Sequence, residues 1–254
     1  MKGVTVIIPI GKNFTAETDK ALLEKAVASV EKGTNVVYVG AEDKLPETLE
    51  TNEKNIVNTG ETDFCSQINL AVSKIRTKYF SILEYDDEYT SIWFKNVEDY
   101  IKNKPDDTSV YLPLTEVYDY QRPESGAIGY ANDAVWAASF SEEIGCIDLA
   151  CLDYYTTFSL TGSVFKTDDF KEIGGLKPSI TFAFWYEFLM RAAYNGKRLY
   201  TIPKIGYHHF VNRKGSLSDT YATTMTAEEG DKWLDIAKKE YFFKTARNIK
   251  EIYD

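Results

Sequence analysis

The sequence predicts an α/β fold in which a mostly parallel sheet is flanked by helices. Short, continuously apolar segments such as 4–10 alternate with stretches of helical periodicity such as 18–31, and this alternation with short connections is typical of a doubly wound sheet. One apolar segment, 79–83, runs directly into four acids within the five residues Glu84–Glu88. Because unpaired buried carboxylates are costly, these acids are expected at the carboxyl end of a strand, where open α/β sheets bind ligands.

The composition favours a folded chain with a large core. Of the 254 residues, 44% are hydrophobic and 14% aromatic, which is enough for one large α/β domain or two small ones and argues against disorder. Lys and Arg number 29 against 39 Asp and Glu, giving a net charge of -10. Nonspecific nucleic-acid binding is therefore not expected, since it normally requires a basic face.

The cysteine pattern and the absence of long apolar runs predict a cytoplasmic protein. Cys65, Cys146 and Cys151 are scattered without metal-ligand spacing, so neither a zinc site nor a disulfide framework is indicated. No apolar run approaches the ~20 residues needed to cross a bilayer, and the first residues lack the apolar core of a signal peptide.

The first half of the chain supplies the strands and helices of the parallel sheet. The apolar strand at its start is expected to end its pairing at Pro9, and Gly33 is placed to end the first helix. In order, we expect a strand at 4–10, a helix at 18–31, strands at 35–39 and 55–57, a helix at 62–76 and the acid-terminated strand at 79–83.

The second half is less regular. Pro113 indicates that the strand at 109–114 lies at an edge or ends there. Residues 116–157 mix aromatic, acidic and glycine residues and are expected to be irregular, forming either a sugar-binding surface or an insertion with its own small core. The remaining expected elements are a helix from Trp93 to residue 103, a strand at 160–166, a short helix at 170–176, a helix around 184–191, a strand at 199–203 and one or two amphipathic helices at 227–253.

A resemblance to a known family gives the acid cluster a function. Leu83-Glu84-Tyr85-Asp86-Asp87 resembles the Asp-x-Asp-Asp segment of family 2 glycosyltransferases with the GT-A fold, which holds a divalent metal and the diphosphate of a sugar nucleotide. Three further segments match in order and spacing over most of 4–218: the first strand ending in Ile8-Pro9, the Phe170…Ile173-Gly174-Gly175 helix, and the Gly215-Ser216-x-Ser218 loop. The resemblance implies a GT-A-like fold with a C-terminal helical extension.

The same residues also support a cation site without the resemblance. Clustered carboxylates repel one another, and hard divalent cations relieve this because they prefer oxygen ligands. The alternative is a solvated acidic turn that caps the following helix. The segment departs from the family at its first acid, which is Glu84 rather than Asp.

The resemblance assigns the metal and donor contacts. Asp86 becomes the direct ligand of Mn²⁺ or Mg²⁺, and Glu84 contacts the donor nucleotide or sugar. Where the family has an Asp pair that reads uracil, this chain has Val39-Gly40-Ala41-Glu42-Asp43, so Glu42 or Asp43 replaces it. The expected donor-binding residues are Pro9, Ile10, Glu42, Asn69, Glu84, Arg213 and Lys214.

Both histidines of the chain lie in the segment that resembles the family's closing loop. Neutral imidazole is a ligand for Mn²⁺-type ions, and strand alternation points His208 and His209 to opposite faces, so that one of them contributes and His209 is assigned. Arg213 and Lys214 are expected on phosphate oxygens. The alternative is a solvated basic turn beside one packed histidine.

The sequence departs from the family at the position of the catalytic base. The family places a Glu-Asp pair at the start of a helix, but alignment on Arg191 puts Phe184 and Trp185 at those positions. Glu187 then either acts as the base or forms a surface i,i+4 pair with Arg191, worth only ~0.3–0.5 kcal/mol.

The remaining site assignments complete this hypothesis. Asp87, the last acid of the segment, joins Glu187 as a catalytic residue, and Asp148 and Asp153 are further candidates for the base. Trp185, Tyr186 and Asp153 are assigned to the acceptor side.

These residues imply a metal-dependent, inverting transfer of a sugar from a nucleotide-sugar, expected to be a UDP-sugar, to the hydroxyl of a glycan or other acceptor. The alternatives are a noncatalytic nucleotide-sugar-binding module that has lost the base, and a nucleotidyltransferase, against which the missing Gly-rich, Lys-bearing loop argues. We expect a glycosyltransferase domain at 1–218, with a donor half at 1–115 and an acceptor half at 116–218, followed by a helical extension at 219–254.

Overall fold

The computed structural model describes residues 1, 3–48, 52–60, 63–103, 107–136 and 143–242. Its first half contains β1 (Val4–Pro9), α1 (Ala16–Ser29), β2 (Asn35–Gly40), β3 (Glu53–Val57), α2 (Phe64–Lys74), β4 (Tyr79–Ile82), β5 (Glu88–Tyr89) and α3 (Trp93–Asn103). Its second half contains β6 (Thr108–Asp119), β7 (Ala127–Ala131), α4 (Leu149–Tyr154), β8 (Val164–Lys166), α5 (Thr167–Glu172), α6 (Phe184–Tyr194), β9 (Arg198–Val211), α7 (Leu217–Thr224) and α8 (Ala227–Glu240). Short 3₁₀ turns lie at Glu42–Lys44, Pro123–Ser125 and Ala134–Trp136.

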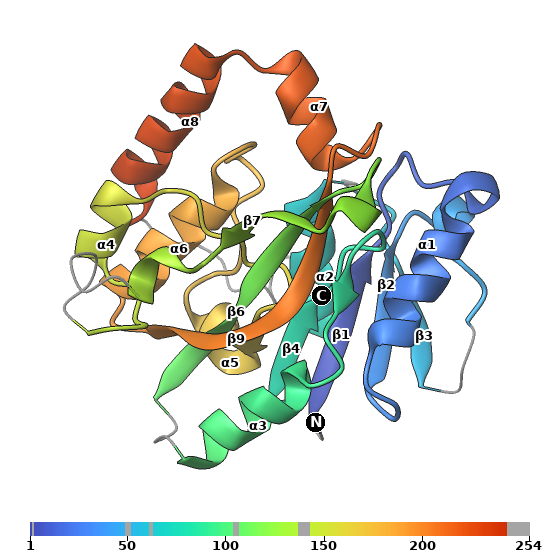
Figure 1. Cartoon of the computed structure of the whole chain (residues 1–254), viewed down its shortest axis with the longest axis horizontal. Helices are drawn as coiled ribbons and strands as arrows, with labels where there is room; N and C mark the ends of the chain where they lie inside the picture. Colours follow the sequence, from blue (N-terminus) through green and yellow to red (C-terminus); the bar gives the residue numbers. More distant parts are fainter. Residues whose placement is uncertain (2, 49–51, 61–62, 104–106, 137–142, 243–254) are drawn as a thin grey trace.

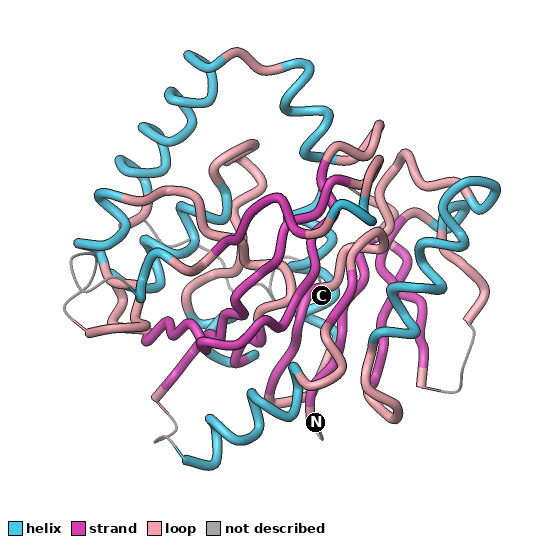
Figure 2. The backbone as a smooth tube through the Cα atoms, in the orientation of Figure 1, coloured by secondary structure: helices cyan, strands magenta, loops and turns pink. Residues whose placement is uncertain are grey.

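The strands form one sheet in the order β3-β2-β1-β4-β8-β6-β9-β5, with β7 paired to β6 (Figure 1). Strands β3, β2, β1 and β4 are parallel, β8 is antiparallel to both β4 and β6, and β9 is parallel to β6. Figure 2 shows helices on both sides of this twisted sheet. The expected α/β class is confirmed, and its consequence is that the carboxyl ends of β1 and β4 lie side by side at one edge.

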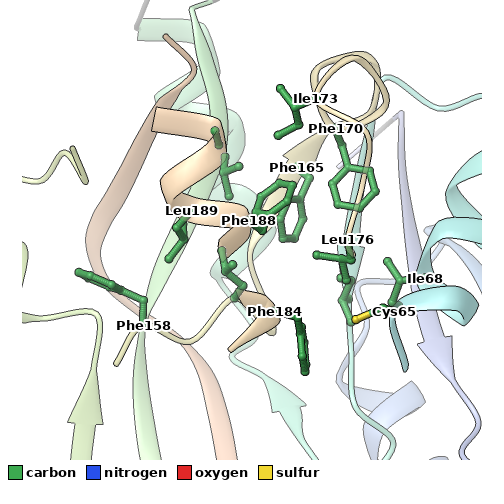
Figure 3. Close-up of a cluster of buried hydrophobic side chains, with 14 of the residues drawn as sticks. Cys65, Ile68, Phe158, Phe165, Phe170, Ile173, Leu176, Phe184, Phe188 and Leu189 are labelled. Atoms are coloured by element: carbon green, nitrogen blue, oxygen red, sulfur yellow. The ribbon is translucent and has the colours of Figure 1, made fainter. Parts of the chain in front are cut away.

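Strands β1, β2 and β4 of the first half could be predicted from sequence because they are buried and therefore largely apolar. All six residues of β1 are buried, as expected for a parallel strand covered on both faces. Alternate side chains enter different clusters, with Ile7 in one and Val6 and Ile8 in the other. The first cluster is rich in aromatic rings: Phe80 stacks on Phe165 at 4.8 Å between ring centroids. Figure 3 shows Phe165, Phe170 and Phe188 of this cluster together.

One expectation for the second half is wrong and another holds only in part. Pro113 neither ends its strand nor lies at an edge, because β6 continues to Asp119 and is paired on both sides. The missing N–H of Pro113 is accommodated by a register shift between Leu112 and Leu114. The described part of 116–157 is less irregular than expected, since it holds the end of β6, all of β7 and α4 among turns and loops. The strand pattern was concealed because side chains such as Ile128 and Tyr130 are exposed.

The end of the chain packs onto the domain. Strand β9 runs through Pro203 to Val211, well beyond the expected 199–203. Ala237 of α8 is fully buried, and Trp233 and Ile236 pack beside it against the first cluster. The expected boundary between 218 and 219 falls inside α7, and the part of the 227–253 prediction after residue 242 lies outside the described residues. In the part of the chain that is described, no helix has the length and apolarity needed to cross a bilayer.

Gly162 is required where the chain turns into β8. It has a φ of +77°, and a Cβ added there would lie 2.4 Å from Cδ2 of Tyr207. Gly162→Ala is therefore expected to lower the free energy of unfolding by about 1–3 kcal/mol through overpacking, in addition to the cost of its left-handed backbone. Urea denaturation measures the change.

Gly196→Ala is the matched control, because Gly196 has a φ of +71° but no atom within 4 Å of the added Cβ. It carries the conformational cost without the clash. Equal losses in the two variants would contradict the packing explanation.

Candidate active site

A cleft of about 600 Å³ opens at the edge where β1 and β4 end. Its walls come from segments far apart in sequence: the residues after β1, the N-terminus of α2, the acid turn after β4, and the start of α7, which follows β9 at the same edge (Figure 1). The lining residues are Pro9, Gly11, Lys12, Asn13, Asp63, Phe64, Cys65, Gln67, Glu84, Tyr85, Asp86, Pro178, Ile180, Thr181, Phe184, Arg213, Gly215, Ser216, Leu217, Thr220 and Tyr221. This volume is typical of a site for a small molecule.

The acid turn, residues 84–88, forms because β4 stops at Ile82 and β5 begins at Glu88. The N–H of Asp87 donates to the carbonyl of Glu84 at 3.1 Å and closes the turn. Strand β5 then pairs antiparallel with β9, with Glu88 opposite His208. The pairing brings the end of β9 to the acid turn, and with it the basic residues predicted for the site.

Asp86 is paired with Arg213 at the wall of the cleft. Nε of Arg213 donates to Oδ2 of Asp86 at 2.6 Å, and Nη2 donates to the hydroxyl of Tyr85 at 2.8 Å. A second carboxylate, Asp19, lies 3.6 Å from Nη1. Burial and then the neighbouring Asp87 raise the pKa of Asp86, while Arg213 opposes both effects. Arg213, predicted to bind phosphate, thus contacts Asp86, the predicted metal ligand.

Asp87 is turned away from the cleft toward β9. Its side chain is 1% exposed, with Oδ2 2.8 Å from Nδ1 of His209 and Oδ1 accepting the N–H of Phe210 at 2.8 Å. Burial would lower the pKa of His209, but Asp87 and then Glu84 and Asp86 raise it to about 10. His208 contacts Glu116 instead, at 3.3 Å. The two histidines therefore have different partners, as strand alternation predicted.

Three carboxyls of the acid turn share two cationic partners. Among the residues that the structure describes, the cationic partners of the Glu84, Asp86 and Asp87 carboxyls are Arg213 and His209. Burial, and then repulsion from Asp87, raises the pKa of Glu84 to about 8. Within the described residues, no three Asp, Glu, His or Cys side chains form a ready-made metal site. Mg²⁺-type ions are nevertheless often held by one or two carboxylates together with substrate phosphates, and the acid turn fits that arrangement.

Comparison with solved structures relates this architecture to known proteins. Residues 1–349 of S. aureus TarS in complex with UDP-GlcNAc match 98% of this chain and 71% of their own, with a TM-score of 0.62 and 14% identity. The same residues of TarS in complex with UDP match 94% of this chain and 71% of their own, with a TM-score of 0.59 and 16% identity. The mannosyltransferase PcManGT from Pyrobaculum calidifontis, in complex with GDP-Man and Mn²⁺, matches 94% of this chain and 69% of its own, with a TM-score of 0.56 and 14% identity.

The chain has a GT-A-like glycosyltransferase fold. This confirms the fold expected from the acid cluster and its neighbouring motifs. No protein-family model matches the chain, and no curated protein matches its sequence. At these identities the similarity describes the fold, so the roles of individual residues depend on the geometry of the site.

The predicted donor-binding residues are dispersed in this fold. Pro9 and Glu84 line the cleft, and the carbonyl of Ile10 accepts a hydrogen bond from Gln67 at 3.0 Å. Asn69 is buried and bonds to the backbone of Leu176, donating to its carbonyl at 2.7 Å and accepting its N–H at 2.9 Å. Glu42 and Lys214 are exposed and do not line the cleft.

Glu187 lies in the core of the glycosyltransferase fold. Its two carboxylate oxygens accept bonds from Nε and Nη2 of Arg191 at 2.8 and 2.9 Å, and Nζ of Lys177 lies 2.8 Å away. The side chains of Glu187 and Arg191 are both 0% exposed. The expected i,i+4 pair therefore exists, but its expected surface location is wrong, because this face of α6 packs against the 173–177 segment and α8.

The acceptor-side residues are likewise separated. Tyr186 is buried and donates to the carbonyl of Leu152 at 2.7 Å, whereas Asp153 is exposed on α4. Trp185 is half-buried and packs against Phe64. Phe184, at one of the positions where an acid was expected, lines the cleft instead.

The prediction from sequence omitted one wall of the cleft, formed by the N-terminus of α2. Asp63 caps this helix by accepting the N–H of Ser66 at 3.0 Å, and Phe64 and Gln67 also line the cleft. A signal was present: Asp immediately before a helical apolar pattern is a typical N-cap. A helix that follows a parallel strand begins at the carboxyl edge of the sheet, where ligands bind. The N-cap position of Asp63 could therefore have identified it as a candidate site residue.

Proposed function

We propose that the protein is a family 2 glycosyltransferase that moves a sugar from a nucleotide-sugar donor to an acceptor hydroxyl. The observation that carries the proposal is the pairing of the acid turn with Arg213 on the wall of a 600 Å³ cleft, at the carboxyl edge of the sheet. TarS and PcManGT, which share the fold, were solved with UDP, UDP-GlcNAc and GDP-Man. We propose a UDP-sugar as donor.

The residues of the cleft have distinct roles in this proposal. The Arg213 guanidinium, which presents several N–H donors, binds oxygens of the donor diphosphate, and Glu84, which lines the cleft, contacts the donor. A divalent cation, Mn²⁺ or Mg²⁺, would be held by Asp86 and by Nε2 of His209, from which it would displace the proton, since Nδ1 of His209 is already bonded to Asp87. The bound cation would supply neutralisation of charge on the leaving diphosphate. Holding donor and acceptor in line within one cleft favours direct displacement with inversion.

One observation favours the noncatalytic alternative. Glu187 is locked in a buried ion pair, and Phe184 and Trp185 stand where the family has acids. A nucleotide-sugar-binding module would retain the cleft without a base. A nucleotidyltransferase would instead release pyrophosphate.

The release of UDP from a panel of UDP-sugars, measured with Mn²⁺ and with EDTA, tests the proposal. We expect turnover by the wild type with Mn²⁺ and a loss of about 10²–10³-fold in Asp86→Ala, the magnitude typical of removing a group that stabilises developing charge. Glu88→Ala is the matched control, since this neighbouring acid pairs with Lys25 and not with Arg213.

The other outcomes distinguish the alternatives. Tight binding of UDP-sugars without turnover under any condition would establish the binding module. Release of pyrophosphate from a nucleoside triphosphate and a sugar phosphate would establish the nucleotidyltransferase.

A further inference from the structure

Two aromatic residues that line the cleft, Phe64 and Phe184, meet where the resemblance places the family's acids. Phe184 and Trp185 begin α6, and the ring of Phe64 packs against both, with centroid distances of 5.6 and 5.5 Å. Phe64 is the first residue of α2. The start of α2 and the start of α6 therefore meet at one place, and Asp63 directly precedes the ring that contacts the position where an acid on α6 would stand.

The residue at that tip is Asp63, which is exposed and lines the cleft. Among the described residues that line the cleft, the carboxylates are Asp63, Glu84 and Asp86. Glu84 and Asp86 belong to the acid turn, and Asp86 is paired with Arg213. Asp63 thus lies on the wall formed by the start of α2, whereas the other two carboxylates lie on the wall formed by the acid turn.

The surroundings of Asp63 hold its carboxylate in place. Oδ1 accepts the N–H of Ser66, which fixes the side chain at the N-terminus of α2. Tyr221 of α7 lines the same cleft: its hydroxyl donates to the carbonyl of Thr181, and its ring lies edge-on to Phe182. Burial, then Cys65 and then Asp63 raise the pKa of Tyr221 to about 12, so Tyr221 stays a neutral phenol.

We infer that Asp63 is the general base of the transfer, supplied by α2 in place of the acids missing from α6. This inference rests on the proposed function. The carboxylate of Asp63 takes the proton of the acceptor hydroxyl while that oxygen forms a bond to the anomeric carbon. The bond from the anomeric carbon to the phosphate oxygen breaks, and its electron pair leaves with the nucleoside diphosphate.

Asp63→Asn tests this assignment, because asparagine is an equally good N-cap and removes only the basic oxygen. The readout is UDP release from UDP-GlcNAc, with water or p-nitrophenyl glycosides as acceptor. We expect kcat to fall by about 10²–10⁴-fold, the usual contribution of general acid–base catalysis, while the Kd for UDP changes less than twofold. The wild type should show an acidic limb in its pH–kcat/KM profile that the variant lacks.

Two further variants separate the base from the cap. Asp63→Ser also retains a capping side chain and should lose activity to the same extent with an unchanged melting temperature. Asp168→Asn makes the same substitution in the exposed first turn of α5, away from the cleft, and should leave kcat unchanged.

The failures are distinguishable. If the wild type transfers sugar and Asp63→Asn transfers at the same rate, the inference is wrong and the proposed function stands. A fall in activity matched by an equal weakening of UDP binding would also overturn it, since Asp63 would then be a donor contact. If the wild type turns over no donor, both proposals fail.

Discussion

Replacing Glu187 with alanine is expected to lower the free energy of unfolding by about 3–5 kcal/mol, because removing one member of a buried ion pair leaves its partners charged and unneutralised. Two cations would remain around the vacated carboxylate, Arg191 and Lys177. Arg191 also donates to the carbonyls of Ile173 and Gly175, and Lys177 to that of Glu240. Loss of the carboxylate therefore loosens α6, the 173–177 segment and the end of α8 together.

Urea denaturation of the two proteins gives the change directly. Glu24→Ala is the matched control: Glu24 also forms an i,i+4 ion pair, with Lys20 at 3.9 Å, but both side chains are at least half exposed. That pair should contribute less than about 0.5 kcal/mol. A loss for Glu187→Ala as small as that of the control would contradict the account of a buried charge network and return Glu187 to the list of catalytic candidates.

The Glu187 network shows what local sequence patterns could not reveal. The spacing of Glu187 and Arg191 predicted their pairing, and this is correct because both lie on one helix. Whether such a pair is buried depends on distant residues such as Lys177 and on the carbonyl of Gly175, and no feature of the helix itself specifies them. The i,i+4 spacing is therefore compatible with either an exposed ion pair or a buried network, and the sequence of the helix does not distinguish them.

Elements defined by their own residues were predictable, whereas contacts between distant strands were not. Continuous apolarity identified β1, and the abrupt change from apolar to acidic residues located the turn after β4. The two-residue strand β5 was missed because so short a segment has no periodicity. Its pairing with β9 decides which histidine meets the acid turn. Strand alternation predicted that the histidines diverge, and the register of that pairing is the reason that His209, and not His208, contacts Asp87.

This pairing leads to the second large expected effect. Asp87→Ala should lower the free energy of unfolding of the metal-free protein by about 3–5 kcal/mol at pH 6, since it leaves His209 without its buried partner and the N–H of Phe210 without an acceptor. Asp87 and its neighbours raise the pKa of His209 to about 10, above its ordinary value of 6.5. The stabilisation is therefore complete below pH 6.5 and is lost as the pH rises toward 10. Denaturation in EDTA from pH 6 to 10 should show this decline in the wild type and a flatter profile in the variant. Glu88→Ala is the control, because it breaks an ion pair with the exposed Lys25; it should lower the free energy of unfolding by less than about 1 kcal/mol and keep the pH dependence of the wild type. If Asp87→Ala also keeps the pH dependence of the wild type, another group holds the proton of His209.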